Sequence, residues 1–382
     1  MNSRLGLPKQ EPVWEFAQCT GPLTEPHSLQ PEAGAPSIEL RPKEIIIVTL
    51  RTSRRPRLLS LAAIAAGAAL VLSACTSAPA DDAETKPEGA STVSITDNHG
   101  TVEVPVNPET VVALDNHVFE TLDSWNVELA AAPKGIMGSV WPNYTDNEDV
   151  VDVGAHREPN LEAIVAAQPD VIFAGYRFSS FYEDIKTQNP DAVVLDFSPR
   201  EGEDLMSELK RSTTILGDIF DKKDEADALN TKLDDAIAGA KEAYNGTDTV
   251  MGLITSGGKV EYVAATTGRS VGPVFPALGL VPAIEQEAED TSHGDDISVE
   301  AIAAANPDWA IVLDRDASFA PEDLEPGAAP ADELIAGSEA LQKVTAVEKG
   351  QIVYLDADFY LTEDIQAYTA LFEQIKDAFQ AA

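Results

Sequence analysis

Three arginines stand where their side chains could recognise an anion. Arg177 ends the stretch NLEAIVAAQPDVIFAGYR. Arg315 ends a second stretch, SVEAIAAANPDWAIVLDR, which matches the first at eight of eighteen positions. In both copies a helical pattern and a short apolar run precede the arginine, so each arginine should follow a buried strand. Ligands of open α/β sheets bind beyond the carboxyl ends of the strands. The repeat therefore predicts two guanidinium groups facing one bound anion.

Other side chains could join this site. Arg269 lies in TTGRSVGPVFPALG, a Thr/Gly-rich turn before a helix, and such turns present N–H groups to anions. His293, in TSHGDD, could donate a hydrogen bond to an anionic oxygen, and Tyr360, in DADFYLTED, follows an apolar strand. Trp141, in VWPNYTD, is a candidate for the wall of the pocket. We predict that these four residues contribute to the ligand site.

Each of these side chains also has a purely structural interpretation. In a chain this acidic, an arginine could form a surface ion pair, worth about 0–1 kcal/mol. His293 could simply open a helix, and Tyr360 could be a half-buried aromatic residue. The matched positions of Arg177 and Arg315 favour the ligand-binding interpretation for that pair.

The elements that would position these residues alternate between strands and helices. Short apolar runs followed by helical patterns fill residues 93–203, and the alternation resumes over 246–382, which predicts two Rossmann-like α/β lobes with a ligand cleft between them. Residues 204–245 contain no proline and carry apolar residues three and four apart. This stretch predicts a long helix that joins the lobes, or a pair of helices broken near Gly217.

The beginning of the chain has the pattern of an exported lipoprotein. The basic run RTSRRPR precedes the uncharged run LLSLAAIAAGAALVL and then LSAC, which ends at Cys75. We interpret residues 48–75 as a lipoprotein signal peptide, Cys75 as the lipidated residue and residues 76–92 as a flexible tether. Residues 1–47 would then be a mis-annotated leader. A retained membrane anchor is the alternative, and both place residues 76–382 outside the cytoplasmic membrane.

The composition excludes several classes of protein. There are 65 acidic and 26 basic residues, and the net charge of −39 repels nucleic acid. The only cysteines are Cys19 and Cys75, which rules out a disulfide framework and a cysteine-rich metal site.

These motifs together resemble the substrate-binding lipoproteins of iron–siderophore ABC importers, the class III group with a helical backbone. The likeness rests on the LSAC ending, PNLEAIVAAQPDVIFAGYR, TGR, SHG, NPDWAIVLDRD and IVYLDADFYL. Within the group it is most similar to binders of ferric catecholates of the petrobactin type. The resemblance implies that Arg177, Arg269 and Arg315 surround an anionic ferric complex, with His293 and Tyr360 assisting and no direct metal ligand from the protein.

The resemblance also implies partners. Glu162 and Glu300, the repeated glutamates of the two matching stretches, correspond to the residues that dock onto a permease. Their alternative role is local, since a glutamate in the first turn of a helix stabilises the helix dipole. We expect a monomer that is lipid-anchored on the extracytoplasmic face, works with a permease and its ATPase, and has neither a cofactor nor an enzymatic activity.

Other ligands and one other class of protein remain open. Within the same fold, haem, cobalamin or a hydroxamate siderophore could replace the catecholate. A zinc or manganese site needs several converging histidines, whereas those of the exported part are scattered at His99, His117, His156 and His293. An extracytoplasmic hydrolase is the more distant alternative, because the sequence has no Gly-x-Ser-x-Gly, Walker or His-Glu-x-x-His motif.

Overall fold

The computed structural model describes residues 91–289 and 293–382. The predicted leader, the signal peptide with Cys75 and nearly all of the tether lie outside the described residues. Within the described ranges, no helix is both long and apolar enough to cross a bilayer.

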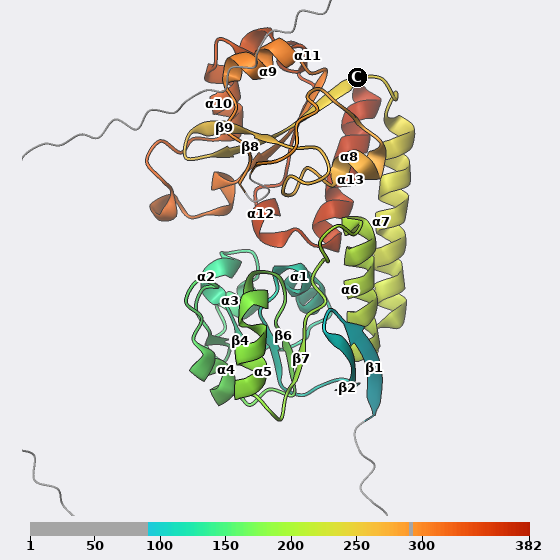
Figure 1. Cartoon of the computed structure of the whole chain (residues 1–382), viewed down its shortest axis with the longest axis vertical. Coiled ribbons are helices and arrows are strands. Elements are labelled where there is room, and N and C mark those ends of the chain that lie inside the picture. The colour runs from blue at the N-terminus through green and yellow to red at the C-terminus, as the bar shows by residue number, and fades with distance from the viewer. Residues whose placement is uncertain (1–90, 290–292) are drawn as a thin grey trace, which may run out of the picture. The chain divides into compact units, whose positions relative to one another are not determined.

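The N-terminal lobe is built on a five-stranded parallel sheet with the order β5-β4-β3-β6-β7 (Figure 1). A β-hairpin of β1 (Thr92–Asp97) and β2 (Gly100–Pro105) precedes it. The central strands β3 and β6 are fully buried, as expected for a parallel sheet covered on both faces. The strands of the sheet are β3 (Val111–Ala113), β4 (Ala131–Ala132), β5 (Val151–Asp152), β6 (Val171–Phe173) and β7 (Val193–Leu195). The helices are α1 (Asn116–Ser124), α2 (Lys134–Met137), α3 (Pro142–Thr145), α4 (Leu161–Ala167) and α5 (Tyr182–Gln188).

The C-terminal lobe repeats this plan with a sheet of order β10-β8-β11-β12, to which β9 adds antiparallel to β8. Its strands are β8 (Thr249–Ser256), β9 (Lys259–Val263), β10 (Val281–Pro282), β11 (Trp309–Asp314) and β12 (Ile352–Tyr354). Its helices are α8 (Val274–Leu278), α9 (Val299–Ala305), α10 (Ala331–Gly337), α11 (Thr345–Lys349), α12 (Phe359–Thr362) and α13 (Ile365–Ala381). The strand order reverses between β3 and β6 in one lobe and between β8 and β11 in the other. Such switch points are where open α/β sheets bind ligands.

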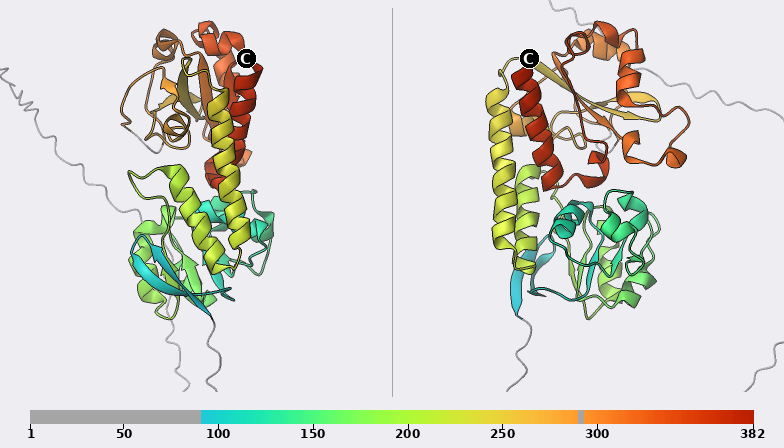
Figure 2. Two further views of the ribbon diagram at one scale, coloured as in Figure 1. Left: turned by 90° about the vertical axis from the view of Figure 1, so that its right-hand side faces the viewer. Right: turned by 180° about the vertical axis from the view of Figure 1, so that it is seen from behind.

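Two helices, rather than one, connect the lobes. Helix α6 (Leu205–Ile219) ends at Phe220, the chain turns at Asp221 with φ +52°, and α7 (Lys223–Ala243) follows and packs against both α6 and α13 (Figures 1 and 2). The break therefore comes after Gly217, which remains inside α6. A Cβ at Gly217 would lie 2.7 Å from the Cβ of Ala226, so this glycine permits the close approach of the two helices. The second expectation from the sequence, a pair of helices broken near Gly217, is therefore confirmed, with the break a few residues after this glycine.

The repeated line of sequence corresponds to a repeated structural unit. Helices α4 and α9 begin alike, because the side chains of Asn160 and Ser298 accept hydrogen bonds from the backbone N–H groups three residues later. They also end alike, at Gln168 and Asn306 in the left-handed conformation. A buried strand follows each helix, and the arginine comes after the strand. Each copy of the repeat therefore places one arginine at the carboxyl end of its sheet.

Candidate ligand-binding site

A cavity of about 730 Å³ lies at the carboxyl ends of both sheets and is lined by residues of both lobes. Five residues expected from the sequence line it: Arg177, Arg269, His293, Arg315 and Tyr360. His293 is exposed, whereas Tyr360 is only 5% exposed. The structure thus brings together residues from five separate stretches of the chain.

The remaining expected residue, Trp141, does not line this cavity. Its side chain is 0% exposed and packs edge-on against Phe119 with a centroid distance of 5.1 Å. Its indole N–H donates a hydrogen bond to Glu120 at 2.9 Å. Trp141 is therefore a core residue of the N-terminal lobe. From the VWPNYTD motif alone, a tryptophan buried in the core cannot be distinguished from one that lines a pocket.

The ring of Tyr360 is the point on which the three arginines converge. The guanidinium carbons of Arg269, Arg315 and Arg177 lie 4.1, 5.1 and 5.6 Å from its centroid. These distances are within the range of cation–π attraction. Burial by itself would raise the pKa of the Tyr360 phenol, but the positive charges of Arg269, Arg177 and Arg315 outweigh it and hold that pKa below its usual value. The cavity wall therefore combines an aromatic face with concentrated positive charge.

The three arginines are not equivalent, because Arg269 already has a buried partner. Its Nε–H donates to Glu363 at 3.0 Å and a second N–H donates to the other carboxylate oxygen, with side chains 12% and 6% exposed. Glu363 also accepts hydrogen bonds from Ser270 at 2.6 Å and Tyr176 at 3.0 Å. Burial would raise the pKa of Glu363, yet the charge of Arg269 keeps it below its usual value. This pair contributes little net charge to the cavity.

Arg177 and Arg315 keep unused donors. Among the described residues, Nε and Nη2 of Arg177 and Nε of Arg315 are buried and have no hydrogen-bond partner. Arg315 is held by a hydrogen bond from Nη1 to Ser256 at 3.1 Å and lies 3.6 Å from Asp316. Buried donors without partners are costly, and a bound anion would satisfy them. These two arginines therefore supply most of the free binding capacity of the site.

Tyr176 does not line the cavity but contacts Arg177, which does, and the sequence did not identify this supporting role. It has φ +53° and starts a 3₁₀ turn shortly after the end of β6, and its ring lies 5.3 Å from the guanidinium of Arg177. Gly175 before it allows this path, because a Cβ there would come within 2.6 Å of the Asp115 carboxylate. A tyrosine beside Arg177 was visible in the sequence, but its left-handed backbone was not.

His156 and Arg157 also line the cavity and were not identified from the sequence. Burial, followed by the charges of Arg177 and Arg157, lowers the pKa of His156, so a neutral imidazole is favoured. The carboxylates that line the same cavity belong to Asp146, Asp323 and Asp358. The site is therefore positive at its Tyr360 wall and mixed in charge elsewhere.

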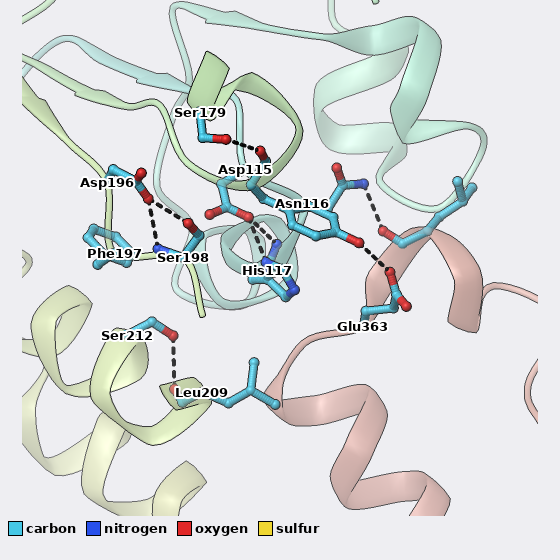
Figure 3. Close-up of polar contacts among 12 residues, drawn as sticks. Asp115, Asn116, His117, Ser179, Asp196, Phe197, Ser198, Leu209, Ser212 and Glu363 are labelled. Atoms are coloured by element: carbon cyan, nitrogen blue, oxygen red, sulfur yellow. Dashed lines mark hydrogen bonds and ion pairs between the residues drawn. The ribbon is translucent and has the colours of Figure 1, made fainter. Parts of the chain in front are cut away.

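Polar contacts around the start of α1 include one that joins the two lobes (Figure 3). The amide of Asn116 donates to the carbonyl of Leu361 at 2.8 Å. His117 lies 2.8 Å from the Asp115 carboxylate, which also caps α1. Burial would lower the pKa of His117, but the Asp115 carboxylate reverses the effect and raises it. The Asn116–Leu361 hydrogen bond therefore joins α1 of the N-terminal lobe to α12 of the C-terminal lobe.

Comparison with known proteins agrees with this architecture. A family model described as periplasmic binding protein matches residues 111–359. The chain belongs to the periplasmic binding protein family. Among the described residues of this binding protein, no group of three or more His, Cys, Asp or Glu could hold a metal ion.

Two curated relatives and two solved structures illustrate the similarity. The petrobactin-binding protein YclQ of Bacillus subtilis is 27% identical over 83% of this chain and 97% of its own. The ferric-anguibactin-binding protein FatB of Vibrio anguillarum is 27% identical over 71% and 82%. A TroA-like periplasmic binding protein of Xylanimonas cellulosilytica is 28% identical, with a TM-score of 0.62 over 73% and 91%. The catecholate-siderophore binding protein VctP of Vibrio cholerae, 23% identical, shares the fold with a TM-score of 0.64 over 76% and 100%.

Proposed function

We propose that this binding protein captures a ferric siderophore of the catecholate type outside the cytoplasmic membrane and delivers it to the permease of an ABC importer. The observation that carries the proposal is the convergence of Arg177, Arg269 and Arg315 on Tyr360 within a cavity of about 730 Å³. Ferric catecholates combine aromatic rings with negative charge, and this wall offers guanidinium and phenol groups to both. The similarity to YclQ, named as a petrobactin-binding protein, and to FatB, named as a ferric-anguibactin-binding protein, supports a ferric siderophore as the ligand class.

The strong negative charge of the chain does not oppose this ligand. At physiological ionic strength the Debye length is about 8 Å, so most surface carboxylates are screened from the cavity. One arginine about 5 Å from a unit negative charge contributes roughly 3 kcal/mol at an effective dielectric constant of 20. The attraction of the arginines in the cavity for an anion therefore exceeds the repulsion from the distant surface carboxylates.

Glu162 and Glu300 are proposed to dock the permease. Both are exposed in the first turn of the matched helices α4 and α9, one in each lobe. Reversing their charge, with Glu162→Arg and Glu300→Arg, should abolish uptake and leave ligand binding unchanged. Glu183→Arg is the matched control, because Glu183 is an exposed first-turn glutamate of α5 outside the repeat. Loss of uptake in all three variants would contradict the docking role.

The remaining parts of the proposal concern attachment and partners. Cys75 would carry the lipid that holds the protein on the extracytoplasmic face, and the protein would act as a monomer with the permease and its ATPase. It would carry out no covalent chemistry. Labelling with a radioactive fatty acid, lost in Cys75→Ser, tests the anchor directly.

Quenching of intrinsic tryptophan fluorescence tests the ligand class. The purified protein is titrated with ferric catecholates, ferric hydroxamates and haemin, beside Arg177→Ala and the control Lys186→Ala, which removes an exposed cation that does not line the cavity. We expect saturable quenching by a ferric catecholate that weakens only in Arg177→Ala. A response to haemin or a hydroxamate alone would move the function to those ligands.

A further inference from the structure

A second cavity, of about 490 Å³, lies at the junction of the two lobes. Helix α12 forms a wall of both cavities, because Phe359 lines the second cavity whereas Tyr360 and Leu361 line the first. Of the residues that the structure describes, only Asp358 lines both. Glu120 of α1 is a lining residue from the N-terminal lobe. Most of the other lining residues come from α12, α13 and the segment after β12.

The charge of this second cavity has a single sign. Four carboxylates line it, those of Glu120, Asp356, Asp358 and Asp364, and none of the described lining residues is Lys, Arg or His. Burial and the nearby charge of Asp356 raise the pKa of Asp358. The carboxylates therefore disfavour one another's ionised forms, and no described lining residue supplies a cation. His117, which lies outside the lining, offsets this in part, because its charge lowers the pKa of Asp364.

Asp364 is the residue that indicates a ligand. Its side chain is 0% exposed, and it caps α13 by accepting the backbone N–H of Ala367 on Oδ1 at 2.8 Å. Its other oxygen, Oδ2, has no hydrogen-bond partner among the described residues. Burial in the first place, with a contribution from Glu120, raises the pKa of Asp364 to about 7. A buried acceptor without a donor is costly, and a cationic donor in the cavity would remove that cost.

The rest of the lining selects the kind of cation. Val140, Phe359 and Leu371, together with Ala367 and Ala370, supply apolar surface beside the carboxylates. No cluster of described residues has the geometry to hold a metal ion. A ligand that suits both features carries an N–H-donating positive charge and an aliphatic chain.

We propose that this second cavity binds a protonated aliphatic amine, with its ammonium group against Asp364 and Glu120 and its alkyl chain over Phe359 and Leu371. The ammonium group donates to Oδ2 of Asp364, and the methylene groups displace water from the apolar wall. This cavity shares α12 and Asp358 with the cavity lined by the arginines, but the proposed amine contacts lie on its own side of that wall, and the proposal does not depend on the function proposed above.

Calorimetric titration of the purified protein with n-butylammonium at low ionic strength tests the proposal. Uncharged n-butanol tests whether the alkyl chain alone is enough for binding. Potassium chloride tests whether a positive charge alone is enough. We expect saturable binding of n-butylammonium only, weakened by about tenfold or more in Asp364→Asn. Asparagine caps helices as well as aspartate does, so this variant should fold. Asp377→Asn, on an exposed part of the same helix, is the matched control and should bind as the unaltered protein does.

Two further variants keep the test decisive if Asp364→Asn is unstable. Glu120→Gln retains an oxygen that can accept the Trp141 N–H, and Ala370→Leu fills the cavity without altering charge. Both should weaken n-butylammonium binding and leave siderophore binding unchanged. Equal binding of n-butanol, equal competition by potassium, or undiminished binding in Glu120→Gln and Ala370→Leu would overturn the proposal.

Discussion

Replacing Arg177 by alanine should weaken binding of the ferric catecholate by about 100-fold. Arg177 presents buried Nε and Nη2 groups that no described residue satisfies, so its interaction with the ligand is not offset by the loss of an internal partner. At about 5 Å and an effective dielectric constant of 20, its attraction for one negative charge is roughly 3 kcal/mol, and each 1.4 kcal/mol corresponds to about tenfold in affinity. The unliganded variant should melt within a few degrees of the original protein, because the relief of the unsatisfied buried donors offsets the loss of the cation–π contacts with Tyr176 and Tyr360.

Fluorescence quenching and thermal unfolding on the same preparations measure these two quantities. The loss of affinity should shrink as salt is added, because the interaction is electrostatic. Arg177→Lys is an informative intermediate, since a lysine keeps the charge but not the planar set of donors. An affinity in Arg177→Ala within threefold of the original, in a protein that still binds the catecholate, would refute the assignment of Arg177 to the ligand.

Three further outcomes follow from the structure. Arg269→Ala should lower stability by about 3–5 kcal/mol in urea unfolding, because the Glu363 carboxylate stays buried without its partner, and the double variant Arg269→Met with Glu363→Gln should recover most of it. Asp364 has a folded-state pKa of about 7 against 3.8 in the unfolded chain, so the folded state holds an extra proton between those values and this group's contribution to stability falls as pH rises from about 4 to 7. Asp364→Asn should remove that slope in melts recorded across this range. Gly217→Ala should cost about 1–3 kcal/mol, since its Cβ would lie 2.7 Å from a side-chain carbon of α7.

Controls separate these outcomes from general effects of substitution. Gly239→Ala is matched to Gly217→Ala, because its Cβ would meet only the flexible end of Lys376, at 3.0 Å. It should be neutral or stabilising, as alanine usually is in a helix interior. Equal destabilisation by both glycine substitutions would contradict the role assigned to Gly217. A pH slope that survives in Asp364→Asn would place the titrating group elsewhere, with His117 the first alternative.

The positions of the arginines followed from the sequence because they depend on local order. A helix, a left-handed turn and a buried strand each have clear signals, and the residue after such a strand must emerge at the ligand side of its sheet. The equivalence of Arg177 and Arg315 was therefore predictable. Trp141 was not correctly placed, because burial depends on which elements pack over a side chain and not on its neighbours in the chain.

The α/β class, the repeated unit and the residue types available to an anion site could be predicted from the sequence, since periodicity and turn chemistry act over a few residues. The use of the charges depends on the folded structure. That structure placed Glu363 against Arg269, which lies 94 residues away in the chain, and so left Arg177 and Arg315 as the arginines with unused donors. It also placed Glu120 and Asp364 around one cavity. Pairing between distant residues arises from the packing of whole elements, and no local pattern in the chain encodes it.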